Sequence, residues 1–217
     1  MLKKNLLLIF LILTFQQTLS AETIKVFDFT KSEFETLKVK KVRGADAKTK
    51  YSLDKNEYGN FIRSESENAA SGLGKEIKIN LSKTPFLNIT WKVEKDLSGI
   101  NENSKKGHDY AARVFVIKKT GATPLSNRAM NYVYSSNNEI NSNQPSPYTK
   151  KSIDYVLSTT KENLNEWVTV KVNVKEHFKK FHDLDVNDIE GVAIMTDTDN
   201  SEKTAIAYYQ NIYFSSE

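Results

Sequence analysis

Two runs near the end of the chain decide the fold: Gly191-Val-Ala-Ile-Met-Thr-Asp-Thr-Asp-Asn200 and Ala205-Ile-Ala-Tyr-Tyr-Gln-Asn-Ile-Tyr-Phe214. The first run is apolar through Met195 and then ends in two aspartates and an asparagine, whereas the second is rich in tyrosine. Apolar backbone that enters and leaves a short acidic corner is typical of paired strands with polar residues at the tip. We therefore expect a hairpin here, with a functional site at its turn.

The second run separates into two faces when it is read as a strand. One face is expected to form the core between two sheets and carries Ile206, Tyr208, Ile212 and Phe214. The opposite face carries Ala205, Ala207, Tyr209, Asn211 and Tyr213. Small residues beside tyrosines and an amide suit a shallow groove for sugar rings, whose apolar faces stack on aromatic side chains. The same pattern also suits an ordinary solvated sheet surface, so both interpretations stay open.

An earlier strand contains a charge among apolar residues. The run Tyr110-Ala-Ala-Arg-Val-Phe-Val-Ile117 has no charged residue except Arg113. A continuous apolar run of this length predicts a central strand that is covered on both faces. Because an unpaired guanidinium is very expensive to bury, Arg113 needs a carboxylate partner. The candidate partners are Asp109, Asp197 and Asp199.

Alternation of apolar and polar residues marks two further strands. Apolar residues occupy every second position from Ile77 to Leu81 and again from Ile89 to Val93. A short linker, residues 82–85, joins the two runs, so we expect them to be antiparallel neighbours. Trp91 shares the parity of the apolar positions. It is therefore predicted to lie in the core rather than on a surface that stacks against a ligand.

The pattern of elements predicts an all-β fold. About ten strands are expected, with one or two short helices, no βαβ alternation and no internal repeat. This pattern is typical of an antiparallel β-sandwich, and a jelly roll is the best match. Residues 22–217 have the length of a single domain of this kind.

The first 21 residues have the three parts of a secretory signal peptide. Lys3 and Lys4 are followed by an apolar stretch from Leu6 to Phe15, and small residues precede the end of the segment at Ala21. The apolar stretch is too short to anchor the chain in a membrane, and the absence of cysteine excludes a lipid attachment site and a disulfide framework. The mature chain is therefore expected to be periplasmic or secreted, without a transmembrane anchor.

The charge of the chain gives little reason to expect a nucleic-acid partner. The net charge is +4, and the loss of Lys3 and Lys4 with the leader lowers it to about +2. A local excess of basic residues extends from Lys38 to Lys50, but it is diffuse and contains Asp46. Such a run is more typical of a solvated strand face than of a nucleic-acid site. The composition favours no particular oligomeric state.

One long polar segment, residues 135–152, is rich in asparagine and serine. Structureless segments of this length are uncommon in compact domains and often act as lids over functional sites. An ordered crossover between the two sheets fits the sequence equally well.

Most catalytic signatures are missing from the sequence. It contains no phosphate-binding loop, dinucleotide fingerprint, nucleophile elbow or zinc-protease helix. His177 and His182 are five residues apart, so they would lie on different faces of a helix and are predicted to be solvated. His108 precedes Asp109, but a His–Asp pair without a nucleophile is weak evidence of catalysis.

The acidic corner superficially resembles a calcium loop, because alternating aspartates can offer converging oxygens. An EF-hand requires glycine at its sixth position and glutamate at its twelfth, and counting from Asp197 this chain has Glu202 and Tyr208 there. No cofactor is therefore expected, although a structural calcium ion of another kind stays an alternative. In the competing interpretation Asp197 pairs with Arg113, and the residues after Asp197 form the turn.

Several segments together resemble the bacterial family called domain of unknown function 3047 (DUF3047). They extend from about Phe61 to Phe214, and the acidic corner is the most specific of them. The matching segments are Ser71-Gly-Leu73, Asn88-Ile-Thr-Trp-Lys92, Lys106-Gly-His-Asp-Tyr-Ala-Ala-Arg-Val-Phe115, Asn131-Tyr-Val-Tyr134, Glu166-Trp167, and Ile194-Met-Thr-Asp-Thr-Asp-Asn200 with Tyr209.

The resemblance implies an exported protein of this size whose layout is similar to galactose-binding-like jelly rolls, and it implies no particular chemistry. This chain departs from the family pattern at two positions. Where the family usually has paired aspartates before the central strand, this chain has His108-Asp109. Where the family usually has Asn-Tyr-Val-Trp, this chain ends the motif with Tyr134.

The leading hypothesis is an exported, non-catalytic β-sandwich that binds a polar ligand, such as a glycan or cell-envelope saccharide. Polar residues at the ends of strands otherwise too apolar to tolerate them would form one cleft. Arg113 would be its charged centre, Asn131 and Asn200 would bind ligand hydroxyls, and Tyr209 would offer a stacking face. The predicted ligand-binding residues are Asp109, Arg113, Asn131, Asp197, Asp199, Asn200 and Tyr209.

Two alternatives remain at this point. In the first, the protein is a glycan hydrolase or lyase that uses Asp109 with Asp197 or Asp199 as an acid/base pair, which requires two free carboxylates across the scissile bond. In the second, it is an assembly or interaction module of the envelope, which predicts an exposed apolar patch or an open edge strand and no pocket.

Overall fold

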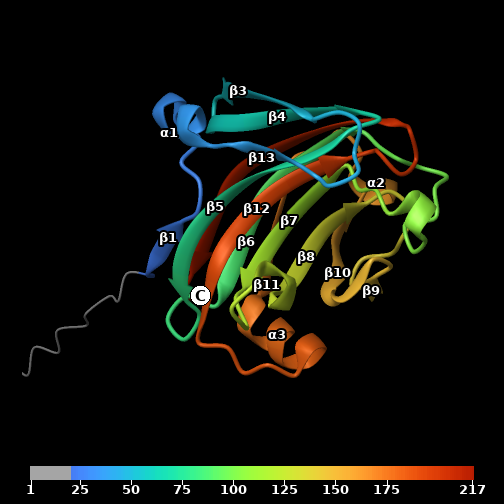
Figure 1. Cartoon of the computed structure of the whole chain (residues 1–217). Coiled ribbons are helices and arrows are strands. Elements are labelled where there is room, and N and C mark those ends of the chain that lie inside the picture. Colours follow the sequence, from blue (N-terminus) through green and yellow to red (C-terminus); the bar gives the residue numbers. More distant parts are fainter. Residues whose placement is uncertain (1–20) are drawn as a thin grey trace, which may run out of the picture.

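The computed structural model describes residues 21–217, so the predicted signal peptide lies outside the described residues except for its last residue. The described chain forms two β-sheets that stack face to face (Figure 1). This architecture is the β-sandwich of jelly-roll layout that the sequence predicts. None of the helices in the described part of the chain is long and apolar enough to cross a membrane.

One sheet has six strands in the order β11-β6-β13-β4-β3, and β1 is added beside β13. The strand pairs within it are antiparallel. Its strands are β1 (Thr23–Lys25), β3 (Lys50–Asn56), β4 (Gly59–Glu67), β6 (Phe86–Lys95), β11 (Val168–Asn173) and β13 (Thr204–Ser215).

The other sheet has seven strands in the order β2-β5-β12-β7-β8-β10-β9. Its pairs are antiparallel except for β8 with β10, which are parallel. Its strands are β2 (Val39–Lys41), β5 (Ala70–Asn80), β7 (Ala112–Lys118), β8 (Arg128–Ser135), β9 (Asn143–Ser146), β10 (Thr149–Thr159) and β12 (Asp188–Asp197).

The polar segment of residues 135–152 explains the parallel pair. It was expected to be a lid or a crossover between sheets, but it contains β9 and the start of β10 and stays within the seven-stranded sheet. A parallel pair needs a connection that returns the chain to the same end of the sheet. This segment supplies the connection, and it places Asp154 of β10 opposite Asn131 of β8.

The expected terminal hairpin is instead an arch between the two sheets. β12 pairs with β5 and β7, whereas β13 pairs with β1, β4 and β6 of the other sheet. The expected β5–β6 pairing is wrong for the same reason, since the two strands belong to different sheets. Alternation indicates which residues are buried, but a hairpin and an arch leave the same alternating pattern.

The buried face of β13 also differs from the predicted one. Ala205, Ala207 and Tyr209 have no exposed surface and face the other sheet. The pairing of β13 with β6 is irregular after residue 210, where Asn211 has φ 48°. An inserted residue reverses the alternation of faces, which explains why the apolar residues beyond it are also buried. The predicted open groove on the Tyr209 face is therefore wrong.

The core lies between the two sheets, and Trp91 is fully buried in it, as predicted. The indole Nε1–H of Trp91 donates a hydrogen bond to Ser158 Oγ at 3.0 Å, across from one sheet to the other. The ring of Tyr134 packs against the indole with ring centroids 5.4 Å apart. These contacts fix the spacing of the sheets beneath β8 and β10.

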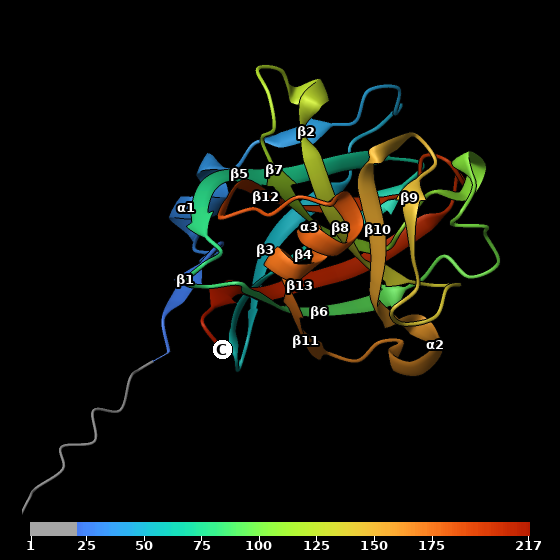
Figure 2. The ribbon, with the colours of Figure 1, turned by 90° about the horizontal axis from the view of Figure 1, so that it is seen from below.

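Within residues 21–217, three short α-helices accompany the sheets: α1 (Lys31–Thr36), α2 (Thr160–Asn163) and α3 (Val174–His182). Asn173 caps α3, because its side-chain oxygen accepts the Glu176 backbone N–H at 3.2 Å. Phe178 is fully buried, as expected for an amphipathic helix. α3 contacts β6 of one sheet and β8 of the other, and it closes the end of the sandwich that faces the viewer in Figure 2.

His177 of α3 is not solvated, contrary to the prediction. Its ring packs 4.4 Å from the ring of Tyr155 and 5.2 Å from that of Phe181. Its Nδ1 atom is buried without a hydrogen-bond partner among the described residues. Burial lowers the pKa of His177 to about 4, so the ring is held neutral.

Candidate functional site

A cleft of about 370 Å³ opens on the outer face of the seven-stranded sheet, beside the arch between β12 and β13. Its floor comes from outward-facing side chains of β7, β8 and β12, and its walls come from the segment after β2 and from the β9–β10 turn. The lining residues include Arg113, Phe115, Asn131, Ser146, Tyr148, Met195, Asp197, Asp199 and Asn200.

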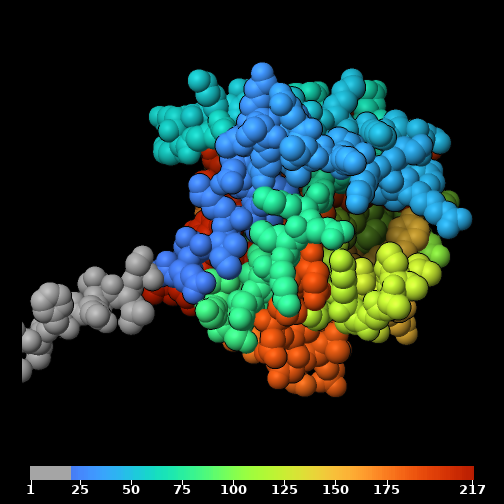
Figure 3. Space-filling view, turned by 60° about the vertical axis from the view of Figure 1, so that its left-hand side comes forward, coloured from blue at the N-terminus to red at the C-terminus, as the bar shows by residue number. Residues whose placement is uncertain are grey.

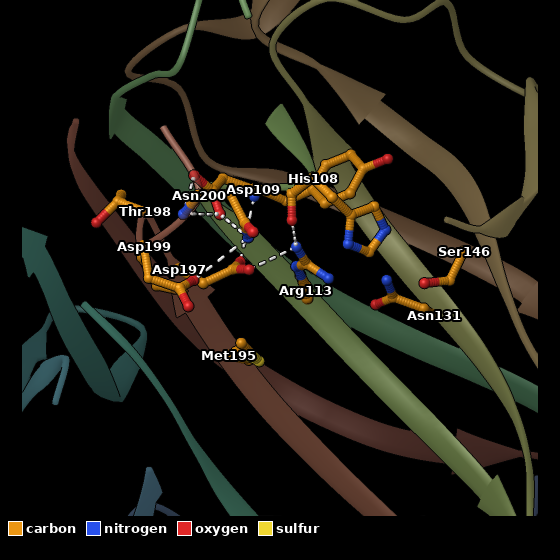
Figure 4. Close-up of polar contacts among 12 residues, drawn as sticks. His108, Asp109, Arg113, Asn131, Ser146, Met195, Asp197, Thr198, Asp199 and Asn200 are labelled. Atoms are coloured by element: carbon orange, nitrogen blue, oxygen red, sulfur yellow. Dashed lines mark hydrogen bonds and ion pairs between the residues drawn. The ribbon is translucent and has the colours of Figure 1, made fainter. Parts of the chain in front are cut away.

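Arg113 lies in the floor of the cleft and is 3% exposed. Its Nη2 atom donates to Asp197 Oδ2 at 2.6 Å and to the His108 carbonyl at 2.5 Å (Figure 4). The guanidinium carbon is 4.6 Å from the centroid of the Tyr110 ring. The predicted ion pair between Arg113 and an aspartate of the acidic corner is therefore confirmed.

Burial acts on both members of this ion pair. It raises the pKa of Asp197 to about 8, although Arg113 acts in the opposite direction. Burial also lowers the pKa of Arg113, but the carboxylates of Asp197 and Asp154 outweigh that effect and raise it. Arg113 therefore stays charged, and it opposes the protonation of Asp197, because a neutral Asp197 would leave the buried guanidinium uncompensated.

Two polar atoms at the floor have no hydrogen-bond partner among the described residues: Arg113 Nε and Asn131 Oδ1. The two side chains line the same cleft, and Asn131 lies on the side of Arg113 away from Asp197 (Figure 4). Asn131 is fully buried, and its Nδ2 donates to Asp154 Oδ1 at 2.6 Å, which leaves its oxygen free. A buried polar atom without a partner costs about 1–3 kcal/mol, so such atoms in a cleft mark where a ligand or an ordered water binds.

A buried His–Asp pair holds the amide of Asn131 in place. His108 Nε2 lies 2.6 Å from Asp154 Oδ2, while the other carboxylate oxygen accepts from Asn131. Burial lowers the pKa of His108, and the hydrogen bond with Asp154 partly offsets this effect. A largely neutral imidazole donating from Nε2 therefore orients Asp154, which in turn fixes which way the Asn131 oxygen points.

Asp109 supports the arch and does not reach the cleft. It is fully buried. Its Oδ2 atom accepts hydrogen bonds from the backbone N–H of Asn200 at 3.1 Å and from the backbone N–H of Ser201 at 2.6 Å. Asn200 Nδ2 donates to Asp109 Oδ1 at 2.8 Å. The prediction that Asp109 contacts a ligand is therefore wrong, because the turn uses both of its oxygens.

Three carboxylates, those of Asp109, Asp197 and Asp199, each offer an oxygen within 4.8 Å of the others. Calcium takes about six to eight oxygen ligands. Here the oxygens of Asp109 already accept turn amides, and those of Asp197 accept Arg113 and the Tyr110 backbone N–H. The guanidinium beside the cluster also disfavours a second cation, so the donor set does not fit a metal ion.

Tyr148 forms the rim of the cleft and was not among the predicted site residues. It lies in the β9–β10 turn with 55% of its surface exposed. Its hydroxyl contacts the side-chain oxygen of Asn200 and the Lys105 carbonyl, and the His108 ring lies 5.6 Å from its ring. The only signal in the sequence was its place in the long polar segment of residues 135–152.

Tyr209 lies beneath the cleft rather than in it. Its hydroxyl donates to the Met195 carbonyl at 2.5 Å and accepts the Arg113 backbone N–H at 3.2 Å. The residue is fully buried, so the prediction that Tyr209 offers a stacking face is wrong. It joins the six-stranded sheet to the backbone of the two strands that carry the site.

The structure thus brings most of the predicted site together. The predicted residues that line the cleft are Arg113, Asn131, Asp197, Asp199 and Asn200. Asp109 and Tyr209 hold the surrounding backbone instead. Sequence reasoning did not assign several lining residues to the site, among them His108, Phe115, Tyr148 and Met195, nor Asp154, which bonds to His108 and Asn131.

Comparison with known proteins identifies a family. A family model described as "Protein of unknown function (DUF3047)" matches residues 35–213. A search of curated proteins finds no match to the chain.

Solved structures with a similar arrangement of strands share little sequence with the chain. A family 30 carbohydrate-binding module is 8% identical, with a TM-score of 0.44 over 82% of this chain and 77% of that one. The xyloglucanase domain of NopAA from Sinorhizobium fredii is 10% identical, with a TM-score of 0.45 over 82% and 92%. Endoglucanase 3 of Trichoderma harzianum, from family GH12, is 8% identical, with a TM-score of 0.44 over 92% and 99%. At this level of agreement, nothing about ligand or activity follows for this chain.

Proposed function

The chain belongs to the DUF3047 family, whose function is unknown, and we propose that it is an exported, non-catalytic protein that binds a saccharide in the cleft beside Arg113. One observation carries the proposal. Arg113 and Asn131 line one cleft, and each holds a buried polar atom, Nε and Oδ1, that has no partner among the described residues.

The chemistry of these two atoms selects the ligand class. Arg113 Nε–H can only donate a hydrogen bond, and Asn131 Oδ1 can only accept one. A hydroxyl group accepts and donates, so a sugar with neighbouring hydroxyls satisfies both atoms at once. A phosphate or carboxylate would satisfy Arg113, but Asn131 Oδ1 and the carboxylate of Asp199 would repel it.

The remainder of the cleft suits a sugar ring. Phe115 and Met195 are half-buried and give the floor an apolar component. Tyr148 offers an exposed aromatic ring at the rim. The apolar face of a pyranose ring packs against aromatic side chains, while its hydroxyls bind polar groups.

The carboxylates favour binding over hydrolysis. Each of the four carboxylate oxygens of Asp109 and Asp197 accepts a hydrogen bond from the protein. In a glycosidase both carboxyl groups face the substrate, whereas Asp109 is fully buried in the turn and Asp197 is bonded to Arg113. An acid/base pair would require Asp197 to leave Arg113. The presence of a cleft also favours a ligand-binding role over an assembly module, which predicts no pocket.

The predicted leader would deliver the protein to the compartment where envelope polysaccharides are present. We therefore propose glycans of the cell envelope as the ligand source. Export and saccharide binding are separate claims, and the binding claim does not depend on the leader.

The binding claim is tested with the mature chain on an array of envelope polysaccharides and their oligosaccharide fragments, followed by titration calorimetry of the hits. We expect Tyr148→Ala to weaken binding about tenfold, equivalent to about 1.4 kcal/mol, without changing the melting temperature. Tyr58→Ala is the matched control, because Tyr58 is 74% exposed and lies outside the cleft. It should change neither quantity.

A second variant addresses the polar atoms themselves. Asn131→Ser shortens the side chain and removes the oxygen from the floor, so it should weaken binding while Tyr58→Ala does not. The proposed function is wrong if no saccharide on the array binds. It is also wrong if Tyr148→Ala and Asn131→Ser both fold and both leave the saccharide affinity unchanged.

A further inference from the structure

A second hollow lies next to the cleft along β12. It has a volume of about 390 Å³ and is lined mainly by the outer face of β5, β12 and β7. The two cavities are neighbours on the sheet, because Met195 of the cleft pairs with Gly72 of the second hollow, and Phe115 of the cleft pairs with Ala193. We refer to the two hollows together as the β12 groove.

The floor of the second hollow is built from residues with little or no side chain. Gly72 and Gly74 of β5 lie beside Gly191 and Ala193 of β12, and Ile117 of β7 borders them. In Figure 3 the orange residues of β12 appear as a strip at the bottom of this hollow, between the green residues of β5 and the yellow-green residues near position 120. Because the side chains at these positions are small or absent, the space above the strands stays open; larger side chains here would fill it.

The groove is long enough for more than one sugar ring. It follows β12 from Gly191 to Asp197, and a strand rises about 3.3 Å per residue, so its length is about 20 Å. Arg113 and Asn131 lie at one end. At the other end Lys119 Nζ and Glu76 Oε2 form an ion pair at 3.6 Å across the groove.

We propose that the ligand is an extended glycan chain of several units lying along β12. One unit binds Arg113 Nε, Asn131 Oδ1 and the ring of Tyr148, and the following units lie over the small-residue floor. This inference rests on the proposed function, because it assumes that the unpartnered atoms of the cleft recognise one sugar unit at that end of the groove.

The floor disfavours a polypeptide in the same position. A peptide gains main-chain hydrogen bonds by adding to a sheet edge, but the floor of this hollow is a sheet face, and its central strands β12 and β7 are paired on both sides. A glycan chain needs no backbone partner, and its hydroxyls at the rim can bind the polar residues there, which include Lys40, Glu76, Lys119 and Asn127.

The test uses oligosaccharides of one to six units from two series: fragments of the envelope polysaccharides on the array, and chito-oligosaccharides of defined length. We expect affinity to rise with chain length until the groove is filled. Gly74→Leu should then reduce the affinity for the longest bound oligomer about tenfold, equivalent to about 1.4 kcal/mol, and leave the shortest unchanged. Gly74 tolerates a side chain, because it is exposed and an added Cβ would lie 3.5 Å from Ala193 Cβ, an ordinary contact.

Ser52→Leu is the matched control, since Ser52 is an exposed position on β3 of the other sheet. Ala193→Leu is a second variant that fills the floor from β12. If a single sugar binds as tightly as its hexamer, or if both floor variants leave the hexamer affinity unchanged in folded protein, the inference is wrong while the proposed function stands. If no oligomer of any series binds, the proposed function is contradicted as well.

Discussion

Arg113 places a charged group in the floor of the cleft. Its strand is otherwise a core strand, and its guanidinium is held by Asp197 and by the His108 carbonyl. These contacts use Nη2 and leave Nε free. A buried ion pair usually stabilises a fold no more than apolar residues of similar volume would, because desolvation offsets most of the attraction. Its presence here is therefore better explained by the binding of a ligand than by stability.

Removing the guanidinium alone should be strongly destabilising. Arg113→Met leaves Asp197 buried without its partner, and we expect a loss of about 3–5 kcal/mol in the free energy of unfolding, measured by urea denaturation. The double variant with Asp197→Leu should recover most of the loss. Equal destabilisation of the single and double variants would show that the pair is not coupled.

Tyr209 and Tyr148 should respond in opposite ways to substitution. Tyr209→Phe removes a hydroxyl that bonds to the backbone of Met195 and Arg113, so we expect a loss of about 1–3 kcal/mol in stability. Saccharide affinity should change little. Tyr148→Ala should instead reduce affinity and leave stability unchanged. Calorimetric melting and ligand titration of both variants distinguish the two roles, and the reverse pattern would contradict our placement of the site.

The residues that the sequence identified were those whose chemistry conflicted with their surroundings. Arg113 could be assigned an acidic partner because a charge inside an apolar run requires one. Tyr209 was placed on the wrong face because a bulge after residue 210 reverses the alternation, and nothing in the local sequence marks it. Asp154 could not be connected with His108, since 46 residues separate them and the contact depends on a parallel strand pair.

At the level of elements, the existence of strands was predictable and their pairing was not. The runs that form β5, β6, β12 and β13 were each identified from alternation or apolar character. Both proposed hairpins were wrong, because the chain crosses to the other sheet at each turn. Whether two adjacent strands pair or form an arch depends on packing between sheets, to which residues far away in the sequence contribute.

Helix α3 should make the protein sensitive to acid. The pKa of His177 is about 4 in the folded state and close to its ordinary value of 6.5 in the unfolded chain, because burial disfavours the charged ring. The folded state therefore binds fewer protons, and stability is lost as the pH falls from 6.5 towards 4. Above 6.5 this contribution is fully present.

His177→Phe retains an aromatic ring against Tyr155 and Phe181 but cannot be protonated. We expect wild type and variant to have similar melting temperatures at pH 7.5, and the wild type to fall below the variant at pH 4.5. Because the carboxylates of the chain titrate equally in both proteins, the difference isolates His177. Parallel pH profiles would contradict the assignment.

At the scale of the molecule, the two sheets have different outer faces. The seven-stranded sheet carries the β12 groove, and the segment after β2 and the β9–β10 turn rise at its sides. The six-stranded sheet carries an aromatic cluster on its outer face, in which Phe61, Trp167 and Tyr208 pack against one another. The strand pattern of the sequence was enough to predict the fold class. It could not predict the groove, because the groove depends on which sheet has an outer face that other segments leave uncovered.

The leader gives a prediction for the whole chain. If residues 1–21 are a signal peptide, protein expressed from the full sequence should be recovered outside the cytoplasm, with its N-terminus near residue 22. Subcellular fractionation with N-terminal sequencing checks both points. Recovery of the intact chain from the cytoplasm would contradict export and leave the binding proposal untouched.

The central claim is that Arg113 Nε–H donates a hydrogen bond to a hydroxyl oxygen of the ligand, and its N–H signal reports this contact directly. The chain has four arginines, Arg43, Arg63, Arg113 and Arg128, so the Nε–Hε signals in a ¹⁵N correlation spectrum are few, and the Arg113→Lys variant assigns the one that matters. Titration with the oligosaccharide that binds most tightly should shift the Arg113 signal and slow its exchange with water, while the Arg63 and Arg128 signals stay in place. A saturated protein in which the Arg113 signal does not move would contradict the account.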